Sequence, residues 1–393
     1  MAAQNPLFRI LLVEDSQTSA ELANYWLEEG LHHQFIVHRA TRLNSALEFL
    51  QRKVVDLTIL DLNLPDSLGL DTFRALHAQD TSVPIVVLSC DADEQLALEA
   101  VRLGAQDYVV KDGRIKNPLA RPVRFAWERV QRHRAEAALR ENQQQLQLAR
   151  TVQQYLLPNG PPILPGFDIA CRCEPADMIG GDYYDFIPLP DGFMGLAIAD
   201  VSGHGTAAAL LMVEIRATLR ALARQKLTLR EIMQATNELM TPDLDYYFVT
   251  AFFAVLRPAT RTLHYGSAAH PALLMTADGL ARQLDAKTPP LGVHVGESII
   301  SDEITLSDGD LLVLYTDGLV ERLNNCKMLF GVNRLVETLR ANRHRTADEI
   351  IESILQAVSA FSGDIAQADD ETLVILKVIG DCAGTTRNSG NDG

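Results

Sequence analysis

The chain has 393 residues, 47% of them hydrophobic, so we expect two or three domains that each bury a core. Its formal net charge of −16 at pH 7 argues against nucleic acid as a partner, because a phosphate backbone demands clustered cations. No apolar run is long enough to span a bilayer and the N-terminus lacks the pattern of a secretion signal, which predicts no membrane association and a cytoplasmic location.

The first part of the chain alternates predicted strands and helices. Short apolar runs with strand character cover residues 8–13, 35–37, 57–60, 85–88 and 108–110, and helical patterns separate them. This alternation predicts a doubly wound α/β domain with five parallel strands. In such folds the functional residues lie at the carboxyl ends of the strands.

Charged and hydroxyl side chains follow four of these strands. Glu14 and Asp15 follow the first strand, Asp61 the third, Ser89 the fourth and Lys111 the fifth. Each alone is compatible with a loop residue that caps a helix, but five such residues at four strand ends indicate a site. Three carboxylates can hold a hard cation such as Mg²⁺. That ion and the Lys111 ammonium can neutralise a phosphoryl group on Asp61, while Ser89 offers it a hydroxyl.

Four motifs at these strand ends resemble the receiver domain of two-component response regulators. They are VEDS at 13–16, DLNLPDSLG at 61–69, LSC at 88–90 and YVVKD at 108–112, and the resemblance covers about residues 1–113. It implies that a histidine kinase or a phosphotransfer protein phosphorylates Asp61. One position departs from the family, which usually has Pro after the Lys where this chain has Asp112, so the resemblance defines the backbone beyond that Lys less well.

The same resemblance implies a ligand set and a switch. The ligands that it implies for Mg²⁺ are Glu14, Asp15, Asp61 and the backbone carbonyl of Asn63. Ser89 and Tyr108 would form the switch that responds to the phosphoryl group.

Residues 123–157 contain neither Gly nor Pro, which predicts a long helix. Two heptad-spaced rows run along it, and their members are Leu139 and Leu146 in one row and Ala135, Asn142, Ala149 and Leu156 in the other. The rows resemble a short coiled-coil seam in which Asn142 could set the register, although Arg132 and Gln153 weaken it. We expect residues 114–158 to form a coiled-coil linker that pairs two copies in a homodimer. The alternative is a single helix lying on one domain.

From residue 160 onward the pattern is rich in strands, with helices in two groups. Strands are predicted over 167–173, 193–199, 248–256, 262–267, 272–275, 311–315 and 372–378, and helices over 207–225, 229–240, 332–339 and 347–361. Consecutive strands with grouped helices indicate α+β layers. We therefore expect a layered β-sandwich domain over 159–380, followed by a disordered tail over 381–393 that is rich in Gly, Ser, Thr and Asn.

Four aspartates of this second domain each lie beside a strand-like segment. They are Asp182, Asp200, Asp317 and Asp369. Four unrelated turn acids are the alternative explanation, but like charges brought together repel unless a cation lies between them. Two divalent ions about 3.5–4 Å apart would bind and activate a bridging hydroxide for attack on a phosphate ester. Oxygen-only ligation favours Mg²⁺ or Mn²⁺ over zinc.

Seven motifs in this region resemble the PPM (protein phosphatase 2C-like) serine/threonine phosphatases, in the bacterial branch that controls sporulation and stress sigma factors. The motifs are LLP at 156–158, GGDYYDF at 180–186, ADVSGHG at 199–205, AAHP at 268–271, PPLGV at 289–293, YTDGLVE at 315–321 and DDETL at 369–373. They follow the family's order and cover nearly all of residues 150–378.

This second resemblance implies the roles of the acids. Asp200 would bridge both metal ions, with the Val201 carbonyl on one of them. Asp317 and Asp369 would complete the other ion's ligands, and Asp182 would act mainly through metal-bound water. Asp185 and Asp370 are expected to be structural or to support the ligands. No counterpart is apparent for the Arg with which eukaryotic members grip the phosphate.

Taken together, the two resemblances predict a response regulator whose output is a metal-dependent phosphoprotein phosphatase. By family analogy its substrate is a phosphoserine or phosphothreonine on an anti-sigma-factor antagonist. An alternative is a phosphatase-fold adaptor that has lost catalysis, which the presence of all four acids disfavours. A DNA-binding output is disfavoured by the acidic charge.

Overall fold

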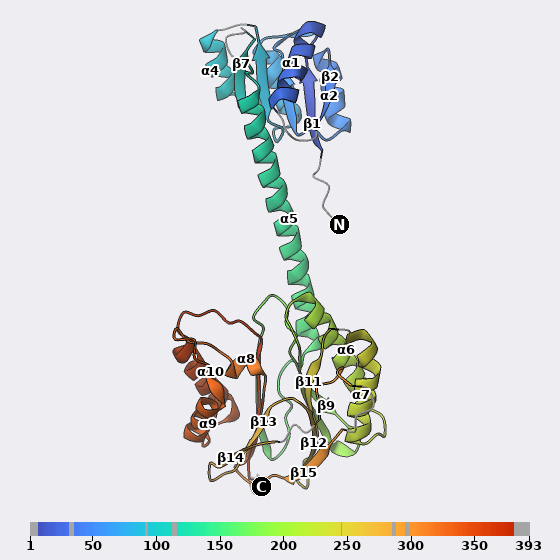
Figure 1. Ribbon diagram of the computed structural model, residues 1–393, viewed down its shortest axis with the longest axis vertical. Coiled ribbons are helices and arrows are strands. Elements are labelled where there is room, and N and C mark those ends of the chain that lie inside the picture. The colour runs from blue at the N-terminus through green and yellow to red at the C-terminus, as the bar shows by residue number, and fades with distance from the viewer. Residues whose placement is uncertain are drawn as a thin grey trace, which may run out of the picture. The chain divides into compact units, whose positions relative to one another are not determined.

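The computed structural model describes residues 7–30, 35–90, 93–111, 116–244, 246–284, 288–294 and 299–380. The chain divides into two compact units, Met1–Asn142 and Gln143–Gly393 (Figure 1). Within the described ranges, no helix is both long and apolar enough to cross a membrane. The predicted tail from residue 381 and the departure at Asp112 lie outside the described residues.

The first unit is built on one parallel sheet with the strand order β2-β1-β3-β6-β7. Its strands are β1 (Phe8–Val13), β2 (Phe35–Ala40), β3 (Leu57–Leu60), β6 (Ile85–Ser89) and β7 (Asp107–Val110). A small hairpin of β4 (Asn63–Leu64) and β5 (Ser67–Leu68) follows β3. Every residue of β3 and β6 is buried, as expected for strands covered on both faces. The predicted parallel α/β fold is confirmed.

Helices cover both faces of this sheet. Trp26 and Leu27 of α1 (Gln17–Gly30) pack on one face in the core cluster that contains Ile10. The other face carries the cluster with Phe73 and Ala100, and its helices are α2 (Leu43–Arg52), α3 (Leu70–Gln79) and α4 (Glu94–Arg102). Side chains of a strand alternate between the faces, so each strand contributes to both clusters.

The long helix predicted over 123–157 is α5 (Ala120–Leu156), which has 37 residues. Its first turns belong to the core of the first unit, because Val123 and Ala126 are buried there and the Trp127 ring meets the Phe8 ring edge-on at 4.9 Å. An ion pair between Arg134 and Asp56 continues this packing. The helical pattern from which a linker over 114–158 is expected does not reveal these tertiary contacts, and the boundaries of the linker stay a prediction. Pairing of α5 with a second copy remains a prediction.

The second unit contains two antiparallel sheets of five strands, with the orders β15-β12-β11-β10-β9 and β14-β13-β16-β17-β8. The strands of the first are β9 (Tyr183–Pro188), β10 (Met194–Val201), β11 (Val249–Arg257), β12 (Thr262–Ala268) and β15 (Ser301–Thr305). Those of the second are β8 (Phe167–Glu174), β13 (Ala272–Met275), β14 (Ala281–Gln283), β16 (Leu311–Tyr315) and β17 (Glu371–Val378). The predicted layered α+β fold is confirmed, although β9, β14 and β15 were not among the predicted strands.

The two sheets pack face to face between two helical layers (Figure 1). Side chains such as Phe186, Leu196 and Leu314 fill the core between the sheets. The outer face of the first sheet is covered by α6 (Thr206–Ala223) and α7 (Leu229–Leu244), and that of the second by α9 (Gly331–Asn342) and α10 (Ala347–Ser362). A single helical turn, α8 (Asp317–Val320), follows β16, and a short 3₁₀ turn (Pro190–Gly192) precedes β10.

A buried ion pair fastens α6 to β9. The Asp185 carboxylate is fully buried and accepts hydrogen bonds from Arg220 at 2.5 and 2.8 Å and from the Tyr183 hydroxyl at 2.7 Å. A bidentate guanidinium–carboxylate pair is among the strongest protein hydrogen-bonding arrangements. These contacts agree with the structural role expected for Asp185.

We predict that Arg220→Ala destabilises the second unit by about 3 kcal/mol, because it leaves the buried Asp185 carboxylate without its cation. Both tryptophans, Trp26 and Trp127, lie in the first unit. Urea unfolding followed by circular dichroism should therefore show an earlier transition while the tryptophan fluorescence transition stays in place. Arg224, an exposed residue at the C-terminal end of α6, provides the control. Arg224→Ala should change the free energy of unfolding by no more than about 0.5 kcal/mol. Equal effects of the two variants would contradict this role for Arg220.

Candidate functional site

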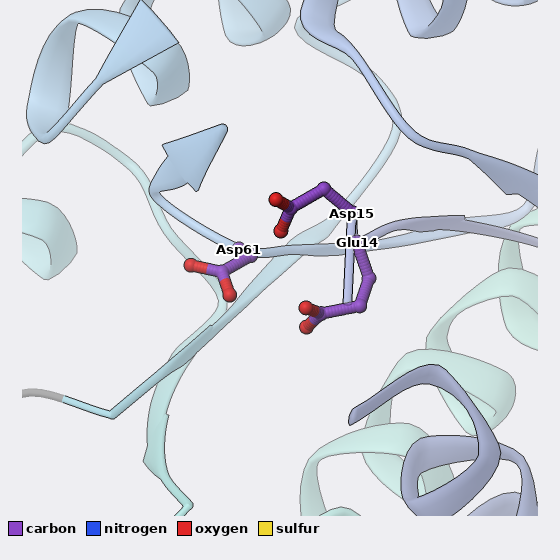
Figure 2. A group of neighbouring side chains, drawn as sticks. All are labelled: Glu14, Asp15 and Asp61. Atoms are coloured by element: carbon purple, nitrogen blue, oxygen red, sulfur yellow. The ribbon is translucent and has the colours of Figure 1, made fainter. Parts of the chain in front are cut away.

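A first carboxylate cluster lies at the carboxyl ends of β1 and β3. Ligand oxygens of Glu14, Asp15 and Asp61 all lie within 4.8 Å of one another, and the three side chains converge in Figure 2. The sheet register sets this arrangement, because the Asp61 N–H donates to the Val13 carbonyl at 2.9 Å and continues the parallel ladder. Glu14 and Asp61 are buried, whereas Asp15 is exposed.

Lys111, from the end of β7, neutralises this cluster. Its buried Nζ donates to Asp61 at 2.7 Å and to Glu14 at 2.5 Å. Burial alone would lower the pKa of Lys111, but the hydrogen bonds to Asp61 and Glu14 outweigh it and raise the pKa. Burial raises the pKa of Glu14 in spite of the opposing hydrogen bond from Lys111. The cluster therefore combines acceptor oxygens with one fixed cation.

The remaining residues predicted for this site surround the same edge of the sheet. The Asn63 N–H donates to the Asp61 carboxylate at 2.9 Å. Ser89 ends β6, is buried, and accepts the Lys111 N–H through its carbonyl at 2.8 Å. Tyr108 is half-buried on the neighbouring β7. The donor set at this edge, carboxylate and carbonyl oxygens without nitrogen or sulfur, fits a hard cation such as Mg²⁺.

A second group of acids comes from adjoining ends of the two sheets of the second unit. Asp182 precedes β9 and Asp200 lies near the end of β10. Asp317 opens α8 directly after β16, and Asp369 and Asp370 precede β17. Strands far apart in the sequence thus deliver acids to one region.

These acids repel one another. Burial, followed by the charges of Asp317 and Asp369, raises the pKa of Asp200 to about 7. Burial and the Asp369 charge likewise raise the pKa of Asp317. A divalent cation would relieve this repulsion, and the oxygen-only donor set fits one. Among the described residues, only the cluster of the first unit brings three ligand atoms within 4.8 Å of one another.

Two threonines that the sequence analysis did not single out hold Asp182. The hydroxyls of Thr316 and Thr372 donate to its Oδ2 at 2.8 and 2.6 Å. Burial, followed by the charge of Asp200, raises the pKa of Asp182 well above its ordinary value. Thr316 lies in the YTDGLVE motif and Thr372 in the DDETL motif. Their position close to Asp317 and Asp369 in the sequence is the signal that could have identified them as site residues.

Asp370 supports the Gly180–Asp182 loop. Its carboxylate accepts the N–H of Ala176 at 2.8 Å and of Gly181 at 2.6 Å. A Cβ at Gly180 would lie 2.4 Å from Asp370 Oδ2, so any larger residue there would displace the Asp370 carboxylate. Glycine is required at Gly318, where a Cβ would lie 2.1 Å from the Asp370 carbonyl. These contacts agree with the supporting role expected for Asp370.

Two further motif residues flank Asp200. Val201 is buried, and its carbonyl oxygen lies close to Gly181: a Cβ added to Gly181 would be 3.1 Å from that oxygen. His270 of the AAHP motif is fully buried, which lowers its pKa to about 3 and keeps it neutral. Its Nδ1 lies 2.8 Å from the hydroxyl of Thr250, the cross-strand partner of Asp200. The sequence analysis quoted this motif without assigning a role to its histidine.

Both parts of the chain match known families. Residues 10–120 match the response regulator receiver domain, and residues 190–379 match stage II sporulation protein E (SpoIIE).

Two relatives and one solved structure extend the second match. Protein IcfG of Synechocystis sp. is 27% identical over 264 residues, a match that covers 60% of this chain and 42% of IcfG. Phosphoserine phosphatase RsbU of Bacillus subtilis is 28% identical over 243 residues, covering 60% of this chain and 71% of RsbU. The structure of the RsbU and RsbW domains of Rv1364c from Mycobacterium tuberculosis has 27% identity and a TM-score of 0.52, and covers 57% of this chain and 64% of that one.

The match thus spans less than half of IcfG, and the comparisons concern domains. At that level the assignments agree with the folds, since a parallel α/β unit underlies the first match and a two-sheet layered unit the second. The chain therefore combines a response regulator receiver domain with a domain that matches SpoIIE and is similar to that of phosphoserine phosphatase RsbU.

Proposed function

We propose that the chain is a response regulator whose receiver controls hydrolysis of phosphoserine or phosphothreonine on a protein substrate. The observation that carries this proposal is the convergence of Asp200, Asp317 and Asp369 from strands of both sheets: burial, followed by the charges of Asp317 and Asp369, raises the pKa of Asp200 to about 7. Acids packed in this way are unfavourable for stability and suited to binding cations. Loss of catalysis would remove the reason to keep them together.

In the receiver, Asp61 is the phosphoacceptor and a histidine kinase or phosphotransfer protein is the donor. Lys111 already contacts the Asp61 carboxylate at 2.7 Å and is placed to neutralise a phosphoryl group attached to it. Glu14, Asp15 and the Asn63 carbonyl would join Asp61 in holding Mg²⁺, which supplies further charge neutralisation. Ser89 and Tyr108 act as the switch.

In the phosphatase domain, two Mg²⁺ or Mn²⁺ ions would be held by Asp200, the Val201 carbonyl, Asp317 and Asp369. Such ions supply an activated hydroxide and charge neutralisation for attack on a phosphate ester. Asp182 contributes through its second carboxylate oxygen, because Thr316 and Thr372 engage Oδ2. The buried, hydrogen-bonded surroundings of Asp182 keep that oxygen in a fixed direction.

The substrate that we propose is a phosphorylated anti-sigma-factor antagonist. The support is analogy: RsbU is named a phosphoserine phosphatase, and Rv1364c joins an RsbU domain to an RsbW domain. The acidic charge of the chain accords with a protein substrate rather than a nucleic acid.

We infer that the chain acts as a homodimer joined through the linker at 114–158, between a receiver at 1–113 and a phosphatase domain at 159–380. The support is that members of the two heptad rows are open to solvent: Leu139 is 59% exposed, and Asn142 and Ala149 are exposed as well. A second α5 helix would cover such side chains, and Asn142 would set the register.

We predict that a small phosphodonor with Mg²⁺ phosphorylates the chain once, on Asp61, since this carboxylate contacts Lys111 within the acid cluster. Intact-mass spectrometry should detect one phosphoryl group on the wild-type chain and none on Asp61→Asn. Asp71→Asn, which alters an exposed aspartate of the same unit, should be labelled like the wild type. Labelling that persists in Asp61→Asn would refute the assignment.

We predict that phosphatase activity requires Mg²⁺ or Mn²⁺ and that Asp200→Ala lowers kcat by several powers of ten. Loss of the shared ligand disrupts both ion sites, which corresponds to about 4 kcal/mol or more of barrier. A phosphoserine peptide assay measures this, with Asp308→Ala at an exposed carboxylate as the control. A variant that keeps a tenth of the activity would contradict the two-metal mechanism, and an inactive wild-type chain would favour the adaptor.

A further inference from the structure

The end of α5 is joined to the phosphatase site by a reciprocal pair of hydrogen bonds. Nε2 of Gln153 donates to the Gly180 carbonyl at 2.7 Å, and the Gly180 N–H donates to Oε1 of Gln153 at 3.2 Å. One amide side chain thus satisfies both backbone groups of a single residue. In the sequence alone, Gln153 is a polar residue that weakens a coiled-coil seam. Its two hydrogen bonds to Gly180 give a different reason for a polar side chain at this position.

The residue that Gln153 holds lies at the start of the loop carrying Asp182. Gly180 packs against Asp370 without room for a Cβ, and the next residue, Gly181, donates its N–H to the same carboxylate at 2.6 Å. Closely packed groups transmit a displacement rather than absorb it. A shift of Gly180 therefore changes the surroundings of both Asp370 and Asp182.

Other contacts fix the same end of α5. Nε of Arg216, on α6, donates to the Leu156 carbonyl at 2.5 Å, and Leu157 packs against the core clusters on both faces of the first sheet. A small cavity of about 50 Å³ lies beside the loop, and its lining includes Gln153, Leu157, Cys173, Asp182 and Asp370. Gln153 therefore forms part of the wall behind Asp182.

We propose that Gln153 is a positioning residue of the phosphatase site, which ties the last turn of α5 to the Gly180–Asp182 loop and sets the placement of Asp182 and Asp370. The inference rests on the proposed phosphatase function and identifies the contact through which α5 reaches the acids. Gln153 touches neither the substrate nor the reacting atoms, and it acts through the backbone of Gly180. Displacement of α5 would pull on this loop directly.

The test compares Gln153→Ala and Gln153→Met in the full chain. Methionine keeps most of the volume and the helix propensity of glutamine while removing both hydrogen bonds. Both variants should bind Mn²⁺ about 10–100-fold more weakly or turn over a phosphoserine peptide about 10–100-fold more slowly, as is typical when a group that orients metal ligands is lost. Backbone hydrogen exchange at Gly180–Asp182 should accelerate, because the Gly180 N–H loses its acceptor.

Gln147→Ala is the matched control, since Gln147 is an exposed glutamine of the same helix. It should leave Mn²⁺ affinity, turnover and exchange at the loop unchanged. Unchanged exchange and Mn²⁺ affinity in Gln153→Met would overturn the proposal even if the variant were less stable. Should the wild-type chain prove inactive, calorimetric Mn²⁺ binding and hydrogen exchange still decide the role of Gln153, whereas the proposed phosphatase function would fail on its own.

Discussion

Asp200 is half-buried near Asp317 and Asp369, and bringing these carboxylates together costs free energy that the rest of the second unit must offset. The raised pKa values of Asp200 and Asp317 reflect that cost. The surrounding fold meets the remaining requirements with fixed donors: threonine hydroxyls hold Asp182, and backbone N–H groups hold Asp370. Two facing sheets are needed, because the acids come from strands of both.

The receiver domain solves a similar problem differently. There the crowded carboxylates of Glu14 and Asp61 are bridged by a buried ammonium from Lys111. A permanent cation lowers the repulsion and still leaves Asp61 accessible to chemistry that adds negative charge. Under the proposed function, the two clusters serve opposite purposes: one accepts a phosphoryl group and the other removes one.

Much of this organisation could be predicted from the sequence where it depends on local pattern. Apolar strands that end in Asp61 or precede Lys111 identify one edge of a parallel sheet, because such strands share their carboxyl ends. The strand β9 was expected only as a strand-like segment beside Asp182, without bounds, because Asp185 interrupts its apolar run. Its partners Arg220 and Tyr183 explain a buried acid there. The edge strands β14 and β15 carry few buried side chains and no clear alternation.

The contacts that hold the sites together could not be predicted in the same way. Thr372 and Asp182 are far apart in the sequence, as are Asp370 and Gly181, so no local pattern links them. From the sequence alone, Gln153 is explained as a polar interruption of a heptad row. Only the hydrogen bond to Gly180 shows that it contacts the second unit. The helical pattern of residues 123–157 likewise does not reveal that the first turns of α5 pack against Phe8.

The central claim is that phosphorylation of Asp61 controls the phosphatase. The most direct measurement is the initial rate of the full chain on a phosphoserine peptide in Mn²⁺, with and without a small phosphodonor, for the wild type and Asp61→Asn. Coupling of about 1–3 kcal/mol corresponds to a change of about 5- to 150-fold in the wild-type rate, in either direction. The account predicts such a change in the wild type and none in Asp61→Asn. An active enzyme whose rate responds equally in both chains, or in neither, would contradict it.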